Sequence, residues 1–230
     1  HFIELVTVCS STTKETEARE TWGCGVTRDL TEILGKNQID VLLVATPHKA
    51  HSESVIAALN AGVHVICEKP LVVSAADLER IREASAASTA ILTVMSQTRF
   101  EPSYQRVKSI IESGKLGQLI RCHLSETFLR DNNYYHSQQW RGTWSGEGGG
   151  VLVNQAPHVL DRYRWLLGQP SSITAICETA LHEISVEDSA TILCRHNDGL
   201  TSTIHISTNE PSASHLEIVG DKGRMLVRDG

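Results

Sequence analysis

Residues 63–70 read VHVICEKP, and the way this stretch ends decides which fold the chain is expected to adopt. An apolar strand, VHVIC, runs directly into Glu68, Lys69 and Pro70 without an intervening polar turn. In an open parallel sheet, ligands bind in the crevice outside the carboxyl ends of the strands. We therefore expect Glu68 and Lys69 to border a ligand site, on a corner that Pro70 stiffens by fixing its own φ angle.

Lys69 has two interpretations at this position. Spacing alone is compatible with a lysine that is exposed to solvent in an ordinary turn, because short motifs produce many chance matches. In the second interpretation Lys69 points into a cleft, where partial desolvation lowers the pKa of its amine and suits it to proton transfer. The strand by itself does not choose between them.

The segments around residues 63–70 alternate between apolar runs and amphipathic stretches. We expect strands at residues 2–10, 39–46, 63–67 and 90–96, with the strand at 39–46 fully buried, and helices at 11–23, 29–37, 50–62 and 75–87. Gly23 and Gly62 mark helix ends. Ser74, with Asp77 three residues later, is typical of a helix start. Strands that alternate with helices predict an α/β domain with a doubly wound parallel sheet.

The pattern changes after about residue 97. A helix is expected at residues 102–114, and long segments of period-two alternation follow at 118–128, 172–180, 188–196 and 200–208. Residues 197–199 (Asn-Asp-Gly) predict a hairpin between the last two of these segments, and residues 220–223 (GDKG) predict another turn. We therefore expect two domains, a parallel α/β domain at 1–97 and an α+β domain with a mostly antiparallel sheet at 98–230.

Composition excludes several classes of protein. The 230 residues are 40% hydrophobic and 21% charged, which is ordinary for a globular protein and disfavours disorder and a membrane span. The formal net charge is -6 and the basic residues are scattered, so nucleic acid is not an expected partner. The six cysteines are far apart and show no Cys-x-x-Cys spacing, so we expect buried, reduced thiols in a cytoplasmic protein.

Four residues of types that bind metals lie near one another in the sequence: His48, His51, His64 and Cys67. These side chains are divided between the start of a predicted helix and a predicted buried strand. A structural or catalytic metal needs three or four ligands that converge on one point. We therefore expect no metal site.

A second group of polar residues follows a glycine-rich segment. In residues 146–170, GEGGGVLVNQAPHVLDRYRWLLGQP, the pattern predicts one helix that follows three consecutive glycines, runs to about Leu167 and stops at Gly168. Asn154, His158 and Asp161 are spaced to lie on one face of that helix, and Pro157 is expected to kink it. A polar face turned to solvent is the alternative, which a single histidine would favour. Three aligned polar groups beside a proline favour a site.

Together these motifs resemble the Gfo/Idh/MocA oxidoreductases, the group that includes glucose-fructose oxidoreductase and inositol dehydrogenase. The resemblance rests on residues 41–71, 97–119, 140–168 and 186–199, and it extends over almost the whole chain. It implies a Rossmann domain that binds NAD or NADP, joined to an α+β domain with a large open sheet. It also implies hydride transfer between the dinucleotide and a sugar, cyclitol or related polyol.

The resemblance assigns roles to individual residues. Lys69 matches the family's catalytic lysine and His158 its catalytic histidine, and we expect Lys69 to be the base with His158 as its partner. Many members have an aspartate where this chain has Asn154, so Asn154 is expected to position substrate by hydrogen bonds. The other expected substrate-side residues are Asp161, Arg99, Trp140 and Arg141, although a structural role suits the Trp140–Arg141 pair equally well. The expected cofactor-binding residues are Ser10, Ser11, Thr46, Pro47, His51, Glu68, Lys69 and Gln97.

The chain departs from the family pattern near its start. No Gly-x-Gly-x-x-Gly turn follows a strand, because residues 23–25 follow a helix and residues 146–150 follow no strand. The opening strand resembles the family's second one, so a strand-helix unit of roughly 30 residues is expected upstream. Ser10 stands where an acidic residue would hold the adenosine ribose. This permits NADP, with Ser10, Ser11 or Lys14 near its 2'-phosphate, and leaves NAD open.

Two functions from different classes follow from these observations. The first is an NAD(P)-dependent dehydrogenase acting on CH-OH groups, which Lys69 and His158 favour. The second is a truncated, catalytically inactive relative that serves as a binding or interaction module, which the missing glycine turn favours. The resemblance also implies a homo-oligomer, a dimer or tetramer, formed through the open sheet. The sequence does not name the sugar or polyol, because specificity depends on a few pocket contacts.

Overall fold

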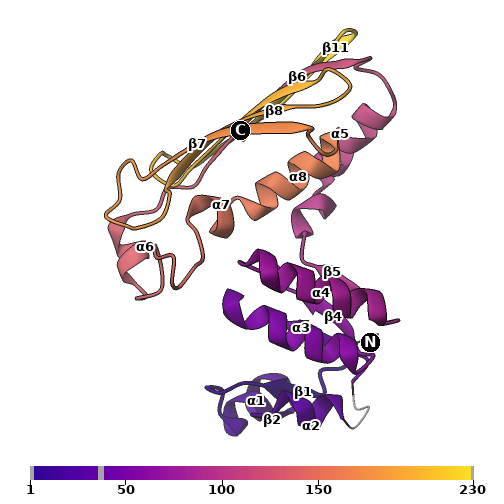
Figure 1. The fold of residues 1–230 in the computed structure, drawn as a ribbon, viewed down its shortest axis with the longest axis vertical. Helices are drawn as coiled ribbons and strands as arrows, with labels where there is room; N and C mark the ends of the chain where they lie inside the picture. The colour runs from indigo at the N-terminus through magenta and orange to yellow at the C-terminus, as the bar shows by residue number, and fades with distance from the viewer. Residues whose placement is uncertain (1–2, 36–38, 229–230) are drawn as a thin grey trace. The chain divides into compact units, whose positions relative to one another are not determined.

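The computed structural model describes residues 3–35 and 39–228. They form two compact units, His1–Met95 and Ser96–Gly230, each with its own hydrophobic core. Figure 1 follows the elements in chain order by colour. The expected fold class is confirmed, since parallel strands with helices are followed by a mostly antiparallel sheet.

Parallel strands and helices alternate through the first unit. In chain order they are β1 (Thr7–Cys9), α1 (Glu15–Trp22), β2 (Gly25–Thr27), α2 (Leu30–Leu34), β3 (Val41–Val44), the 3-10 helix η1 (His48–Ala50), α3 (His51–Asn60), β4 (His64–Cys67), α4 (Ala75–Ala87) and β5 (Leu92–Val94). β1 pairs with β2, and β3, β4 and β5 form a second sheet in that order, all in parallel. Gly23 ends α1 with φ 71°, as predicted, and the Ser74 hydroxyl caps α4 by accepting the Asp77 N–H at 3.4 Å.

The prediction that the strand at 39–46 is fully buried was wrong. Val44 is 2% exposed, but Val41 and Leu43 are 45% and 61% exposed. The buried residues of α3 and α4 share one core with Val44 and Val65, so the described helices cover the face of the sheet to which these two residues point. A continuous apolar run shows that a strand is apolar, but it does not show how many of its faces are covered.

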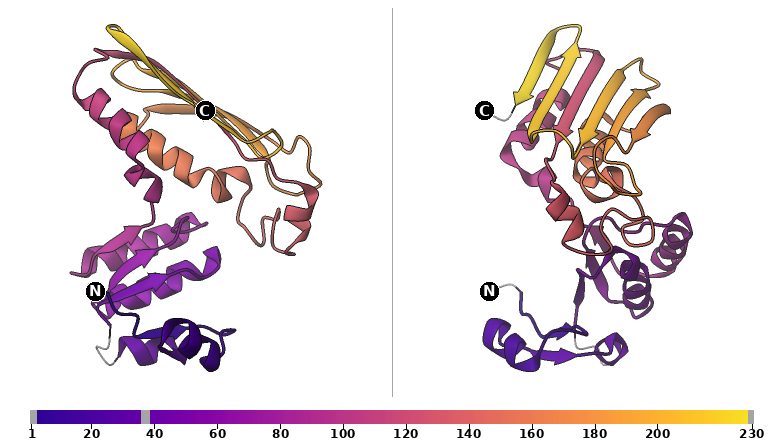
Figure 2. Two further views of the ribbon diagram at one scale, coloured as in Figure 1. Left: turned by 180° about the vertical axis from the view of Figure 1, so that it is seen from behind. Right: turned by 90° about the vertical axis from the view of Figure 1, so that its left-hand side faces the viewer.

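The second unit is a six-stranded sheet with helices against it. Its elements are the 3-10 helix η2 (Gln97–Phe100), α5 (Pro102–Glu112), β6 (Leu119–Thr127), α6 (Asn132–His136), α7 (Val151–Asn154), α8 (Pro157–Leu167), β7 (Ser172–Glu178), β8 (Ser189–Arg195), β9 (Thr201–Ser207), β10 (Ala213–Gly220) and β11 (Gly223–Arg228). The strand order is β11-β10-β6-β9-β8-β7, and only the β6–β9 pair is parallel. Figure 2 shows the sheet from a second side, with α5 and α8 behind it.

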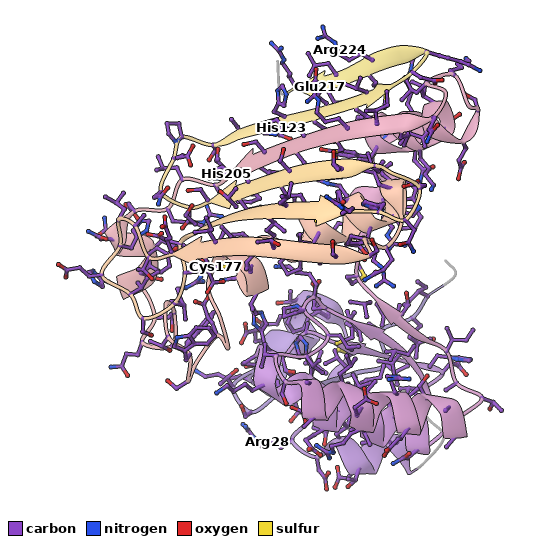
Figure 3. The ribbon with its side chains drawn as sticks, turned by 45° about the horizontal axis from the view of Figure 1, so that its top comes forward. Arg28, His123, Cys177, His205, Glu217 and Arg224 are labelled. Carbon is purple, nitrogen blue, oxygen red and sulfur yellow. The ribbon has the colours of Figure 1, made fainter. Side chains whose placement is uncertain are left out.

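The two faces of this sheet differ in character. Side chains from α5 and α8, among them Val107 and Val159, form one core with alternate residues of the strands, such as Leu124 and Ile204. The other residues of the strands point to the face that no described helix covers, and His123 and His205 are labelled on it in Figure 3. This alternation is the period-two pattern from which the strands were predicted.

Turns in the second unit agree with the sequence. Asn197, Asp198 and Gly199 connect β8 to β9, and Gly199 has φ 92°, which a residue without Cβ adopts most readily. Asp221 and Lys222 connect β10 to β11. The predicted hairpin at 197–199 and the predicted turn at 220–223 are therefore both confirmed.

The prediction of a single kinked helix from the glycines to about Leu167 was wrong, although α8 does end at Leu167. α7 ends at Asn154, and α8 begins at Pro157, which occupies the first position of the new helix. Proline suits that position because its missing N–H is not needed there. Asn154 therefore lies on a different helix from His158 and Asp161, so the prediction that all three share one helical face was also wrong.

The cysteine prediction was correct for four positions and wrong for two. All six cysteines are free thiols, and Cys24, Cys67, Cys122 and Cys194 are buried. Cys9 and Cys177 are exposed, because they lie at the end of the short strand β1 and on the sheet-edge strand β7. Among the helices in the described part of the chain, none combines the length and apolar character that crossing a bilayer requires.

Candidate functional site

Lys69 lies directly after β4, at the end of the sheet where the sequence placed it. The N–H of Glu68 donates to the carbonyl of Val44 at 2.9 Å, which continues the pairing with β3 one residue past the strand. The Lys69–Pro70 peptide bond that follows is cis. Lys69 is half-buried, and this burial lowers the pKa of its amine, which the negative charge of Glu68 partly offsets. The structure therefore supports a desolvated lysine over an ordinary exposed one.

His51 braces this corner from the start of α3. It is fully buried, its Nε2 lies 2.7 Å from the carbonyl oxygen of Thr46, and its Nδ1 lies 2.9 Å from that of Pro70. Carbonyl oxygens only accept hydrogen bonds, so each ring nitrogen donates where it carries a proton. His51 thus ties the segment after β3 to the segment after β4. Its ring nitrogens are directed at backbone, whereas Thr46 and Pro47 are exposed in the turn before η1.

The histidines of the group weighed for metal binding have other partners. Both nitrogens of His51 face carbonyl oxygens, and Nδ1 of His64 accepts the N–H of Ile91 at 2.9 Å. Cys67 is buried, and this burial raises the pKa of its thiol to about 11. A thiol binds metal as thiolate, so burial makes Cys67 a poor ligand. Within residues 3–35 and 39–228 no three His, Cys, Asp or Glu side chains are grouped as metal ligands.

Ser10 and Ser11 lie after β1, in the other parallel sheet of the first unit. The Ser10 hydroxyl oxygen accepts the N–H groups of Thr12 and Thr13 at 3.2 and 3.1 Å and so closes the turn before α1. Ser11 is exposed, and its carbonyl accepts a hydrogen bond from the guanidinium of Arg28. Arg28, which is labelled in Figure 3, directly follows β2, and the parallel pairing of β2 with β1 brings it to the end of β1. The sequence did not single out Arg28, which is separated from Ser11 by 17 positions.

The glycine-rich segment before α7 is shaped by close packing. A Cβ atom on Gly150 would lie 1.8 Å from the carbonyl oxygen of Glu187. The Glu187 carboxylate accepts the N–H of Gly150 at 3.0 Å and that of Leu152 at 3.1 Å, and the backbone carbonyl of Glu187 accepts the N–H of Val151 at 2.9 Å, so Glu187 satisfies the first N–H groups of α7. The N–H groups of Gly150, Val151 and Leu152 therefore already have protein partners and are not open to a phosphate.

Asn154, at the end of α7, is held by side chains. Its Nδ2 donates to the carboxylate of Glu147 and to the hydroxyl of Tyr134, the latter at 3.2 Å. Glu147 is 1% exposed. Burial raises the pKa of the Glu147 carboxyl, against the lowering effect of hydrogen bonds from Gly142 and Asn154. The structure thus places a carboxylate beside Asn154 although position 154 itself is neutral.

Near the start of α8, His158 is half-buried and is the second residue of the helix. Asp161 lies one turn further and forms a two-pronged ion pair with Arg99 of η2, with N–O distances of 2.7 and 2.5 Å. This pairing raises the pKa of Arg99, mainly through the hydrogen bond itself. Arg99 and Asp161 were predicted as substrate-side residues, and in the structure they contact each other and connect η2 to α8.

Trp140 and Arg141 form the stacked pair that the sequence left open as a structural alternative. The Arg141 guanidinium carbon lies 4.7 Å from the centre of the Trp140 ring and 4.2 Å from that of Tyr134. Because Tyr134 also contacts Asn154, the stack adjoins the candidate site residues of the second unit. Gln97 is the exposed first residue of η2, so it belongs to the second unit, whereas the other expected cofactor-side residues belong to the first.

Four residues that contact the candidate site residues were not predicted from the sequence: Arg28, Tyr134, Glu147 and Glu187. Glu147 interrupts a run of glycines, and a charge in such a run is the one local signal that could have drawn attention to it. Glu187 contacts Gly150 across 37 positions, and no local pattern indicates that contact. Tyr134 and Arg28 have ordinary surroundings in the sequence. Their contacts depend on the path of the chain.

Comparisons with known proteins cover nearly the whole chain. Residues 1–96 match the sequence profile described as oxidoreductase family, NAD-binding Rossmann fold, and residues 104–226 match that of the GFO/IDH/MocA C-terminal domain. An uncharacterized oxidoreductase of Schizosaccharomyces pombe is 32% identical over 70% of this chain and 43% of its own length. The 1,5-anhydro-D-fructose reductase of Ensifer adhaerens is 26% identical over 98% of this chain and 68% of its own.

Solved structures show the same fold. The WlbA dehydrogenase of Bordetella pertussis, solved with NADH and UDP-GlcNAcA, is 30% identical with a TM-score of 0.91, over 98% of this chain and 66% of that one. Levoglucosan dehydrogenase, solved with NADH and levoglucosan, is 26% identical with a TM-score of 0.88, over 97% and 64%. The chain spans 43% to 68% of the length of these four relatives. Since one family profile alone covers more than half of the residues, the chain belongs to the GFO/IDH/MocA oxidoreductase family.

Proposed function

We propose that the chain is part of an NAD(P)-dependent dehydrogenase that oxidises a CH-OH group of a sugar, cyclitol or related polyol. The observation that carries this proposal is Lys69, a half-buried amine with a lowered pKa at the carboxyl end of a parallel strand. That is the edge at which open parallel sheets bind ligands. The relatives named levoglucosan dehydrogenase and myo-inositol 2-dehydrogenase support this substrate class.

The chain offers groups for each requirement of the reaction. Oxidation of an alcohol removes the hydroxyl proton to a base while the hydride on the same carbon goes to the nicotinamide ring, which supplies the acceptor. In the neutral form, Lys69 takes the hydroxyl proton and becomes an ammonium ion, and in the reverse direction it returns that proton. His158 is its partner in proton transfer, and Asn154 binds a substrate hydroxyl. The ion pair of Arg99 with Asp161 holds η2 against α8, the helix that carries His158.

Polar groups in the first unit suit a dinucleotide. Ser11 and Arg28 meet at the carboxyl ends of β1 and β2, where hydroxyl and guanidinium groups can bind a ribose or its 2'-phosphate. Arg28 favours NADP, while the relatives solved with NADH favour NAD. The proposal therefore includes either dinucleotide, and the variant Arg28→Ala separates them. Loss of NADPH binding with NADH binding retained would assign the 2'-phosphate to Arg28.

The open face of the six-stranded sheet is proposed as the contact of a homo-oligomer. In the described part of the second unit no helix covers this face, and it carries exposed Leu193 and Leu226 among polar side chains. We further place the protein in the cytoplasm, on the ground of its free thiols. Sedimentation that finds monomer alone at all concentrations would contradict the oligomer.

The test of the function is a titration of the chain with NADH and NADPH, followed by fluorescence, and then a turnover screen. The screen uses levoglucosan, myo-inositol and UDP-GlcNAcA, with formation of reduced nicotinamide as the signal. Saturable binding of one dinucleotide and turnover of one probe are expected, with turnover lost in Lys69→Ala. Binding of neither dinucleotide would instead favour the second function, an inactive relative that acts as a binding module.

A further inference from the structure

Glu147 is a buried carboxylate to which the proposed function assigns no role. Its Oε2 accepts the N–H of Gly142 at 2.7 Å, and its Oε1 accepts the side-chain Nδ2 of Asn154. A carboxylate at 1% exposure is costly unless its oxygens are hydrogen-bonded, and here both are. An apolar side chain could fill the same volume, but it could not orient Asn154.

The carboxylate decides which way the Asn154 amide faces. A carboxylate only accepts hydrogen bonds, so the amide nitrogen must face Glu147 and the amide oxygen must point away from it. The same nitrogen also donates to the hydroxyl of Tyr134 at 3.2 Å, and Gln155 donates to that hydroxyl from the next position at 3.3 Å. Two anchors on one planar group fix its plane. The direction in which Oδ1 points is therefore set by Glu147 and Tyr134.

We propose that Glu147 is a positioning residue that holds Asn154 with its amide oxygen turned to accept a hydrogen bond from a hydroxyl of the substrate. The inference rests on the proposed function and deepens it, because it states which hydrogen bond Asn154 makes. An acceptor at this place selects a substrate with a free hydroxyl at the contacted carbon. A deoxy or methyl-ether analogue at that carbon loses the bond.

The same geometry explains why asparagine suits position 154 in this chain. Asn154→Asp would place two carboxylates within hydrogen-bond distance, and one of them would have to take up a proton. Changing both residues, Glu147→Gln with Asn154→Asp, keeps one carboxylate and one amide and reverses the direction of the bond between them. The double variant is therefore the sharpest test of a direct link between the two side chains.

A purely structural role is the competing explanation. Through Gly142, Glu147 also holds the turn that follows Arg141, and a loosened turn could disturb the site without any link to Asn154. Ser185→Ala is the matched control, because the Ser185 hydroxyl donates to the carbonyl of the same Gly142 at 3.1 Å, a bond separate from the one between the Gly142 N–H and Glu147. It loosens the turn and leaves the carboxylate in place.

The experiment compares the full chain with Glu147→Gln, Asn154→Asp, the double variant and Ser185→Ala, using the probe that turns over best among levoglucosan, myo-inositol and UDP-GlcNAcA. Glu147→Gln is expected to raise KM about tenfold with little change in kcat, the effect of one misplaced hydrogen bond. Asn154→Asp is expected to lower kcat/KM by about a hundredfold, and the double variant to recover most of that loss. Ser185→Ala is expected to lower Tm slightly and leave KM unchanged.

Two kinetic results would overturn the inference. One is strict additivity of the two substitutions in kcat/KM, and the other is a KM effect of Ser185→Ala equal to that of Glu147→Gln. If the unchanged chain turns over none of the probes, the proposed function fails, and the side-chain amide signals of Asn154 in ¹⁵N NMR decide the inference separately. A downfield N–H that disappears in Glu147→Gln and shifts when myo-inositol or levoglucosan is added supports it. An Asn154 signal insensitive to Glu147→Gln or to both probes overturns it.

Discussion

Lys69 and Asn154 are held in two different ways. Lys69 is placed by backbone: it follows a paired strand, precedes a cis peptide bond, and lies on a corner that His51 ties to the segment after β3. Asn154 is placed by side chains, since Glu147 and Tyr134 orient its amide. A backbone corner belongs to the strand that carries it, whereas a network of side chains depends on every one of its members. The two regions should therefore respond differently to substitution.

The largest effect is expected at the backbone-held residue. Lys69→Ala should lower turnover by about 10² to 10⁴-fold, the usual contribution of one acid-base group. In the unchanged protein the oxidation rate should rise with pH through the lowered pKa of Lys69, because only the neutral amine accepts the proton. That limb of the pH profile should be absent from the variant.

Lys115→Ala is the matched control for this experiment, since Lys115 is an exposed lysine after α5. It should leave rate and pH profile unchanged. If the rate of Lys69→Ala still rises with pH in the same way, Lys69 is not the base. The comparison between Lys69 and Asn154 would then no longer hold.

The next largest effect is expected in the side-chain-held region, at Gly150. Gly150→Ala should lower the free energy of unfolding by about 3 kcal/mol, because its Cβ would overlap the backbone carbonyl of Glu187, which cannot move away like a flexible side chain. Urea denaturation followed by one probe in each unit measures it. Gly25→Ala is the control, with nothing within 4 Å of the added Cβ, and should stay within about 0.5 kcal/mol. Equal effects of the two would mean that close packing does not shape this segment.

His51→Ala tests whether the brace matters to the corner it holds. Loss of the hydrogen bond from the ring nitrogen that carries the proton, together with the cavity left by the buried ring, should cost about 2 kcal/mol of stability, and turnover should fall as the Lys69 corner loosens. Denaturation and steady-state kinetics measured on the same sample separate the two effects. Unchanged turnover at reduced stability would show that the strand end positions Lys69 without the brace.

The smallest effect is expected at the Arg99–Asp161 pair. A double-mutant cycle with Arg99→Ala and Asp161→Ala should give a coupling energy of about 1 kcal/mol, since the side chains are 38% and 25% exposed and solvent screens the charges. The coupling should weaken as salt is added. If the substitutions raise KM far more than this coupling energy accounts for, both residues contact the substrate directly, as the sequence predicted.

The difference between the two regions also explains which residues could be predicted. The Lys69 corner was found from the sequence because strand, charge and proline are neighbours there, and the hairpin at Gly199 because its turn residues are adjacent. Glu147 was missed because its partner lies on the next helix. His51 was singled out for the cofactor side, but its two carbonyl partners come from separate strand ends, which spacing does not reveal.

The sequence by itself determined the local order of this chain: parallel strands alternating with helices, then period-two strands, with Lys69 at a strand end and Pro102 at a helix start. These features follow from apolar periodicity and from the backbone limits of proline and glycine, which act over a few residues. Only the tertiary structure decided that β3 buries one face, that Pro157 begins a new helix, and that Glu147 meets Asn154. Each of these features depends on which segments pack together. Packing between segments sets which residues are buried and which groups share a hydrogen bond, and the spacing of residues along the chain does not reveal it.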